Sequence, residues 1–186
     1  MKMRLLYCFI VTLLLLFGVQ AVVAQEQDVE GAAISPTPTP IKYELPYPGL
    51  LPDSPLYFLK TGRDRIINFL ISDPLKKAEF NLLQADKRLQ AGVYLFKKQG
   101  KERLAESTIS KGENYFDQAI AQAQQAQQEG RKVSSLGNRL FLAAQKHQEV
   151  LKSLEAKSPK EIKGSITALK EKVANFEKKV DLLRLK

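Results

Sequence analysis

The sequence has few of the residues that carry redox, metal and nucleophilic chemistry. Its 186 residues include one cysteine, one histidine and no tryptophan. The cysteine, Cys8, lies within an apolar run near the amino terminus, so the chain beyond residue 24 can form no disulfide and has no thiol. Disulfides are needed most by domains too small to bury a core, and a domain of well over 100 residues is not so small. We therefore expect a fold held together by packing.

Recognisable catalytic patterns are also missing. No serine stands in a G-x-S-x-G turn, and no H-E-x-x-H occurs. His147 follows Ala143 and Ala144 at an apolar position, and we expect it to be structural, with its polar edge at the rim of the fold. Glu79 and Asp86 are seven residues apart, and the lysines near them favour a solvated face of mixed charge. Haem or di-iron binding would also lack histidines and core carboxylates. The sequence thus predicts no enzyme, no catalytic or metal-binding residue and no cofactor.

The first 24 residues resemble a secretory leader. A short basic start precedes an apolar run over residues 5–17, and Val22, Val23 and Ala24 offer small side chains for a signal peptidase. We predict a signal peptide over residues 1–24, cleaved after Ala24. The alternative is an uncleaved anchor, because residues 5–24 are nearly all apolar and about 20 such residues span a bilayer. Both interpretations predict an extracytoplasmic protein, either secreted or membrane-tethered through residues 5–24.

Residues 25–44 are expected to be a disordered Thr/Pro-rich spacer. Proline lacks a backbone N–H and holds its predecessor in an extended conformation, so PTPTP at residues 36–40 can form neither helix nor sheet. Such a spacer reaches roughly 3 Å per residue. The proline-rich stretch at 45–55, LPYPGLLPDSP, then joins the spacer to the folded domain, residues 45–186. Its apolar side chains are expected to lie along the domain as a clasp: Leu45, Tyr47, Leu50 and Leu51.

Helix starts are marked three times in the same way. Ser54–Pro55, Asp73–Pro74 and Ser158–Pro159 each pair a good N-cap with a proline at the first helical position, where its missing N–H costs nothing. Glu161, three residues after Ser158, would complete a capping box. Gly100 and Gly130 suit left-handed helix ends. The expected helices are 55–71, 74–99, 102–129, 132–156 and 159–185.

Each of the four long helices has an apolar seam at alternating spacings of three and four. This spacing is typical of antiparallel helices that pack at a shallow angle and are joined by short loops. We therefore predict an all-α fold, an antiparallel bundle of four long helices with a shorter helix before it. Small residues alternate with large ones in the hairpin 74–129, which should be the most closely packed part. The seams are Leu75, Ala78, Leu82, Ala85, Leu89, Gly92 and Phe96; Ala105, Ile109, Gly112, Phe116, Ala119, Ala123 and Ala126; Val133, Leu136, Leu140, Ala143, His147, Val150 and Leu154; and Ile162, Ile166, Leu169, Val173, Phe176, Val180 and Leu183.

The last helix also fits a second arrangement. Its seam alternates β-branched residues with Leu and Phe, a pattern that favours a parallel two-stranded coiled coil. In such a homodimer Lys179 would face Arg184 and repel it, and only Lys172 facing Glu177 would attract. The bundle within one chain, and hence a monomer, is the preferred prediction.

Two segments carry a resemblance to a known family. They are PGLLPDSPLYFLK at residues 48–60 and DPLKKAEFNLLQADKRLQAG at residues 73–92. Together they resemble a bacterial family known as domain of unknown function 5667, over about residues 47–130. The resemblance implies an exported, all-helical envelope or extracellular domain whose role is unknown, and it offers no catalytic residue to transfer.

The balance of charge bears on partners. The chain has 29 Lys and Arg against 20 Asp and Glu, and residues 1–24 hold two of the basic residues and none of the acidic ones, which leaves +7 beyond them. An exported chain without a recognition motif is not expected to bind specific nucleic acid. We expect a non-enzymatic structural or protein-interaction module of the cell envelope with an unidentified protein partner. The alternative is a basic surface that binds anionic envelope polymers or the membrane surface.

Overall fold

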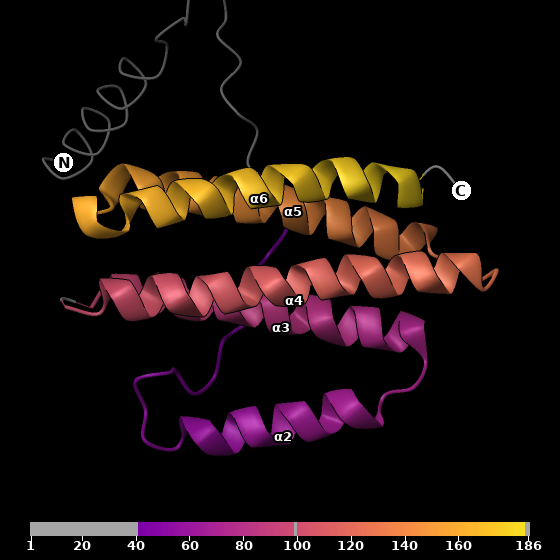
Figure 1. The fold of residues 1–186 in the computed structure, drawn as a ribbon, viewed down its shortest axis with the longest axis horizontal. Coiled ribbons are helices and arrows are strands. Elements are labelled where there is room, and N and C mark those ends of the chain that lie inside the picture. Colours follow the sequence, from indigo (N-terminus) through magenta and orange to yellow (C-terminus); the bar gives the residue numbers. More distant parts are fainter. Residues whose placement is uncertain (1–40, 99, 185–186) are drawn as a thin grey trace, which may run out of the picture. The chain divides into compact units, whose positions relative to one another are not determined.

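The computed structural model describes residues 41–98 and 100–184. The predicted leader, residues 1–24, and the spacer up to residue 40 lie outside the described residues. Within the described part the chain forms five helices and no strand, which confirms the all-α class (Figure 1). They are α2 (Tyr57–Leu70), α3 (Pro74–Phe96), α4 (Glu102–Gln128), α5 (Ser134–Lys157) and α6 (Lys160–Arg184).

The four long helices form two hairpins that pack on each other. The α3–α4 pair makes the most extensive contact, the α5–α6 pair comes next, and α4 joins the two hairpins by packing along α6. Consecutive long helices run antiparallel, whereas α4 and α6 run in the same direction (Figure 1). The short helix α2 lies outside the bundle and contacts α3. The predicted bundle with a shorter preceding helix is therefore confirmed.

The apolar seams predicted from the spacing form the core. Of their 28 positions, 25 are buried, and only Leu75, Phe96 and Val150 are partly exposed. The core is continuous across all four long helices. Burial of one large aliphatic side chain contributes about 1.5–3 kcal/mol, so these seams account for the association of the two hairpins.

Two glycines allow α3 and α4 to approach closely. A Cβ at Gly92 would lie 2.2 Å from Ile109 Cγ1, and a Cβ at Gly112 would lie 3.2 Å from the carbonyl oxygen of Ala85. The hairpin 74–129 is thus closely packed, as predicted. The partner of Gly92 is Ile109 of α4.

The helix starts confirm one predicted N-cap and correct two, and Gly100 and Gly130 have the left-handed φ values predicted for helix ends. Asp73 caps α3, since its side chain accepts a hydrogen bond from the Lys76 backbone N–H at 2.9 Å with Pro74 at the first turn. The start of α2 at Ser54–Pro55 was wrong, because a turn over Leu51–Tyr57 delays the helix to Tyr57. The Ser158 capping box was also wrong: the Ser158 hydroxyl donates back to the Leu154 carbonyl at 2.7 Å and closes α5 instead.

The prolines at 45–55 join the domain differently from the predicted clasp. Leu45 packs against the core, and so does Tyr43, two residues before the expected boundary. Tyr47 and Leu50, however, are 76% and 45% exposed. The clasp is therefore wrong for these two side chains, which face solvent.

None of the helices in the described ranges has the length and apolar character needed to cross a membrane.

Candidate functional site

The centre of the bundle holds a buried cluster of three ionisable side chains, one from each of three helices. His147 of α5 places Nδ1 2.9 Å from Glu113 Oε1 of α4 and Nε2 3.0 Å from Asp86 Oδ1 of α3. His147 and Glu113 are fully buried, and Asp86 is 4% exposed. Because ionised carboxylates only accept hydrogen bonds, two such partners fit a doubly protonated imidazolium that donates from both nitrogens.

The carboxylates control the charge of His147. Burial alone would lower the pKa of His147, but the charge of Glu113 and the hydrogen bonds to Asp86 and Glu113 outweigh it and raise that pKa to about 9. His147 therefore carries a positive charge in the core at neutral pH, between two carboxyl groups. Phe116 closes one side, with its ring edge-on to the imidazole at a centroid distance of 5.0 Å.

A fourth side chain ties the amino-terminal segment to this cluster. The Tyr43 hydroxyl donates to Asp86 Oδ2 at 2.6 Å. Burial and the negative charge of Asp86 both raise the pKa of Tyr43 above its ordinary value, so it stays protonated and can keep donating. Tyr43 and Leu45 lie in a groove between α3 and α5 that Val93 and Val150 also line. The segment thus lies beside a groove between two helices that contact each other little directly.

These positions correct two predictions from the sequence. His147 does not have its polar edge at the rim, because the neighbouring helices supply partners for both ring nitrogens. Asp86 does not lie on a solvated face, and the core does contain carboxylates. Glu79 does lie in a mixed-charge surface, 48% exposed and 3.4 Å from Arg139.

The cluster is sealed on all sides, which limits what it can do. With His147 and Glu113 fully buried, no substrate can reach the ring without opening the bundle. Within the described residues no group of His, Cys, Asp and Glu is arranged to hold a metal ion. The cluster is best understood as a buried ion-pair network that fixes how the helices pair.

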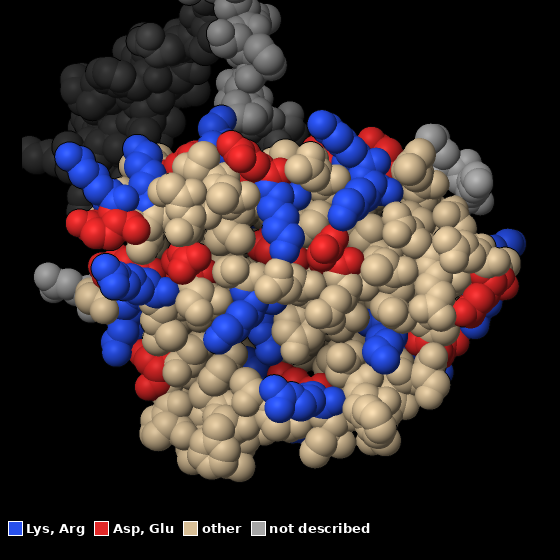
Figure 2. All heavy atoms as spheres, viewed as in Figure 1, with Lys and Arg blue, Asp and Glu red and all other residues tan. Residues whose placement is uncertain are grey.

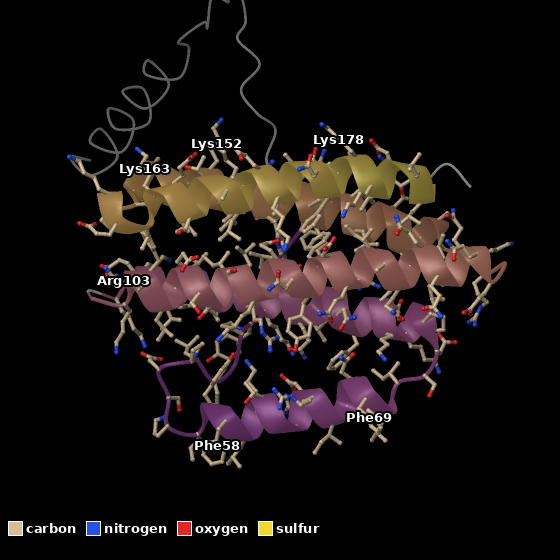
Figure 3. All side chains as sticks on the ribbon, in the orientation of Figure 1. Phe58, Phe69, Arg103, Lys152, Lys163 and Lys178 are labelled. Carbon is tan, nitrogen blue, oxygen red and sulfur yellow. The ribbon has the colours of Figure 1, made fainter. Side chains whose placement is uncertain are left out.

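The exposed face of α2 is a second candidate site. At about 100° per residue, Phe58, Leu59, Ile66, Phe69 and Leu70 fall within about 120° of arc on one side of this helix. They are 65%, 57%, 62%, 83% and 69% exposed. Phe58 and Phe69 point away from the bundle (Figure 3), so the apolar side of an amphipathic helix faces solvent. We call these five side chains the α2 apolar face.

The opposite side of α2 is polar and faces the bundle. Asp64 is only 3% exposed, and neither its Oδ2 nor Asn68 Oδ1 has a hydrogen-bond partner among the described residues. Burial raises the pKa of Tyr57 and lowers the pKa of Lys60. The positive charge of Arg88 on α3 acts on both groups and favours a lower pKa in each. Buried polar atoms without partners are costly. The helix is therefore oriented opposite to the usual arrangement, with its polar side inward.

A comparison with known families covers the part of the chain that contains both the buried cluster and α2. The family described as Domain of unknown function (DUF5667) matches residues 49–161. This chain belongs to that family. No curated protein and no solved structure matches the chain.

The DUF5667 match covers α2 to α5 and the first residues of α6. It extends beyond the segment of about 47–130 that the sequence motifs indicated, and it includes Asp86, Glu113 and His147. Residues of the two motif segments within it have structural roles. Lys60, for example, donates to the Pro48 carbonyl at 2.5 Å and to the Leu50 carbonyl at 3.2 Å, which fastens the proline-rich turn to α2.

Basic side chains of this DUF5667 chain also gather on α5 and α6. Lys152, Lys163 and Lys178 are exposed and point outward, away from α2 (Figure 3). Acidic side chains lie between the basic ones across this face (Figure 2), and Glu155 pairs with Lys170 at 2.5 Å. The surface is therefore mixed in charge with a basic excess, rather than a continuous basic patch.

A signal for the buried cluster exists in the sequence. His147 occupies a seam position, and a seam histidine must find partners for two ring nitrogens. Asp86 and Glu113 each follow a small seam residue, Ala85 and Gly112, by one position. Carboxylates next to small seam residues on neighbouring helices are the partners that such a histidine can reach.

Proposed function

We propose that this protein is a non-enzymatic, exported structural or interaction module of the cell envelope that acts by contact rather than by chemistry. The observation that supports this most strongly is the α2 apolar face. Nine of the thirteen large hydrophobic side chains exposed in the described residues lie in the short segment 47–70. Single exposed apolar residues are ordinary, but a contiguous set of this kind marks a contact surface.

The buried cluster supports the same proposal. Its ionisable groups pair with one another inside the core, although Glu113 Oε2 has no partner among the described residues, and none of them lies at a surface. The bundle then serves as a rigid support that presents α2 at one edge, and the segment 45–55 serves as the joint that sets α2 there.

In-cell photo-crosslinking tests this function. A photoreactive amino acid replaces Phe69, and a matched control replaces Leu182, which is 66% exposed on α6. The proposal predicts that position 69 crosslinks to an envelope component, protein or lipid, and that position 182 crosslinks far less. Equal crosslinking at the two positions, or multiple turnover of any substrate by the purified protein, would contradict it.

A second candidate function rests on the basic excess of α5 and α6. Lys152, Lys163 and Lys178 could attract anionic envelope polymers. Such binding is charge-driven, so it should be lost near 0.5 M salt, where the screening length is about 4 Å. Contact through the α2 apolar face should persist in the same wash. Retention by anionic polymer alone, released by salt and unaffected by changes at Phe69, would favour this second candidate.

A further inference from the structure

The outward side of α2 combines an apolar stripe with basic residues at both of its edges. At about 100° per residue, Arg65 lies next to Phe58 at one edge of the stripe and Arg63 lies next to Leu70 at the other. Both arginines are exposed. Arg63 donates to Asp64 Oδ1 at 2.8 Å, yet 64% of its side chain still faces solvent. The α2 apolar face is thus bordered by positive charge.

From this arrangement we propose that the α2 apolar face binds the surface of a lipid bilayer with anionic headgroups, with α2 lying in the plane of that surface. This proposal rests on the proposed function and names the surface that the module contacts. An amphipathic helix with apolar side chains on one face and Lys or Arg beside them buries that face in the boundary between headgroups and acyl chains. Guanidinium groups at the edges are then placed to donate to lipid phosphates.

The charge pattern argues against a second copy of the chain as the occupant. A two-fold contact repeats the same surface on both partners, so that surface must complement itself. In an α2–α2 contact the arginines of both copies would border one shared apolar stripe. The only acidic residue of α2, Asp64, faces the bundle and already pairs with Arg63 of its own helix, so no carboxylate of α2 is left to compensate Arg65. An anionic bilayer supplies that compensation.

The position of α2 fits a flat, extended surface. The helix lies at the edge of the molecule with Phe58 and Phe69 pointing outward (Figure 3). Tyr47 and Leu50, 76% and 45% exposed, add apolar area beside it. In the sequence an apolar stretch of bilayer-spanning length, residues 5–24, precedes the folded domain, and residues 25–40 separate the two. If residues 5–24 remain attached, they bring the domain within reach of a membrane.

A single tryptophan reports directly on this contact, because the chain has none of its own. In the full chain, Phe69→Trp provides the reporter and Leu182→Trp the matched control. Vesicles of phosphatidylcholine with phosphatidylglycerol, some with bromine on the acyl chains, are the probe. We expect the emission of the Phe69→Trp variant to shift to shorter wavelength and to be quenched by brominated lipid. Emission from the Leu182→Trp variant should stay unchanged, even if residues 5–24 insert.

The charge contribution is tested in the same Phe69→Trp background. Arg65→Gln should weaken insertion into anionic vesicles about fivefold, in line with the usual contribution of one basic residue near such a surface. Arg103→Gln, an exposed arginine on α4, is the control and should have little effect. Vesicles of phosphatidylcholine alone should quench the reporter less.

Several results would overturn the bilayer proposal, and they are separable from failure of the proposed function. A reporter at position 69 that stays in water with every vesicle contradicts it. A blue shift of the reporter in the absence of vesicles also contradicts it. If that shift depends on protein concentration, a second copy of the chain covers the α2 apolar face. If it does not, residues 5–24 of the same chain cover that face. In-cell crosslinking of position 69 to one defined protein, with no lipid adduct, would overturn the bilayer while leaving the contact function intact.

Discussion

At the scale of single residues, the structure depends on a charged group in the middle of an apolar core. His147 is fully buried between Asp86 and Glu113, with Tyr43 as an additional donor to Asp86. Apolar residues of similar volume often match such a network in stability. The network should, however, favour the observed alignment of α3, α4 and α5, since a shifted helix would separate a buried carboxyl group from His147. Its contribution to specificity follows from that constraint.

Removing His147 should be costly because two carboxylates would remain in the core. We expect His147→Leu to lower the free energy of unfolding by about 3–5 kcal/mol, the usual cost of breaking a buried ion pair on one side. Denaturant unfolding measures this change. A loss below about 1 kcal/mol would show that Asp86 and Glu113 are compensated in another way. Lys163→Ala, an exposed change on α6, is the control and should stay within about 0.5 kcal/mol.

The same histidine should make stability depend on pH in a defined window. The pKa of His147 rises from its ordinary 6.5 to about 9 in the fold, with Asp86 and Glu113 facing the ring. Because the folded chain holds the proton more tightly, this contribution is complete below about pH 6.5 and is lost as the pH rises through about 9.

Unfolding free energies measured between these pH values should therefore fall in the wild-type chain and stay level in His147→Leu. Stability that rises over this window, or the same slope in both chains, would contradict the assignment. The raised pKa of Tyr43 keeps its own titration out of the same interval.

At the scale of the elements, the seams predicted which side of each long helix is buried, whereas no pattern in the sequence predicted which side of α2 faces the bundle. The alternating spacing identified the buried faces of α3 to α6 because the apolar seams of the four long helices all meet in one core. The partners of His147 were missed because the seam pattern treats each helix alone, whereas the contacts of Asp86 and Glu113 depend on how three helices are aligned. In α2 the apolar residues also follow a helical period, but periodicity gives only their common side and not whether that side faces the core.

The same limit applies to the short connections. Ser54 and Ser158 have the residue type and spacing of N-caps, yet one lies in a turn and the other closes the preceding helix. Asp73 does cap α3. Local chemistry permits each of these outcomes, and the path of the chain between helices decides among them.

Two glycines on the long helices provide a matched test of the α3–α4 interface. Gly92→Ala places a methyl group against Ile109 and the Ala105 carbonyl, so we expect a loss of about 1–3 kcal/mol from overpacking. Gly164→Ala in α6 meets nothing within 4 Å and should gain about 0.5–1 kcal/mol from helix propensity. Thermal or denaturant unfolding of the two variants gives both values. A gain at Gly92 would mean that α3 and α4 lie farther apart than described.

At the scale of the whole molecule, stability and contact are assigned to different parts. The four long helices hold the core and the charged cluster, while α2 and the segment before it hold most of the exposed apolar side chains. Substitutions on the α2 apolar face should therefore change what the protein touches without changing whether it folds. The basic excess of α5 and α6 lies away from α2 and would act independently.

If the protein acts by contact, the α2 apolar face should be open in the isolated protein and covered in the cell. Replacing Cys8 by serine and Phe69 by cysteine leaves one thiol on this face, and Leu182→Cys in the same background gives one thiol on α6. The measurement is the rate at which a membrane-permeant maleimide labels each thiol, first in purified protein and then in intact cells. We expect position 69 to be labelled rapidly in the purified protein and at least tenfold more slowly in cells, while position 182 is labelled at similar rates in both. Equal labelling of position 69 in the two settings would contradict it.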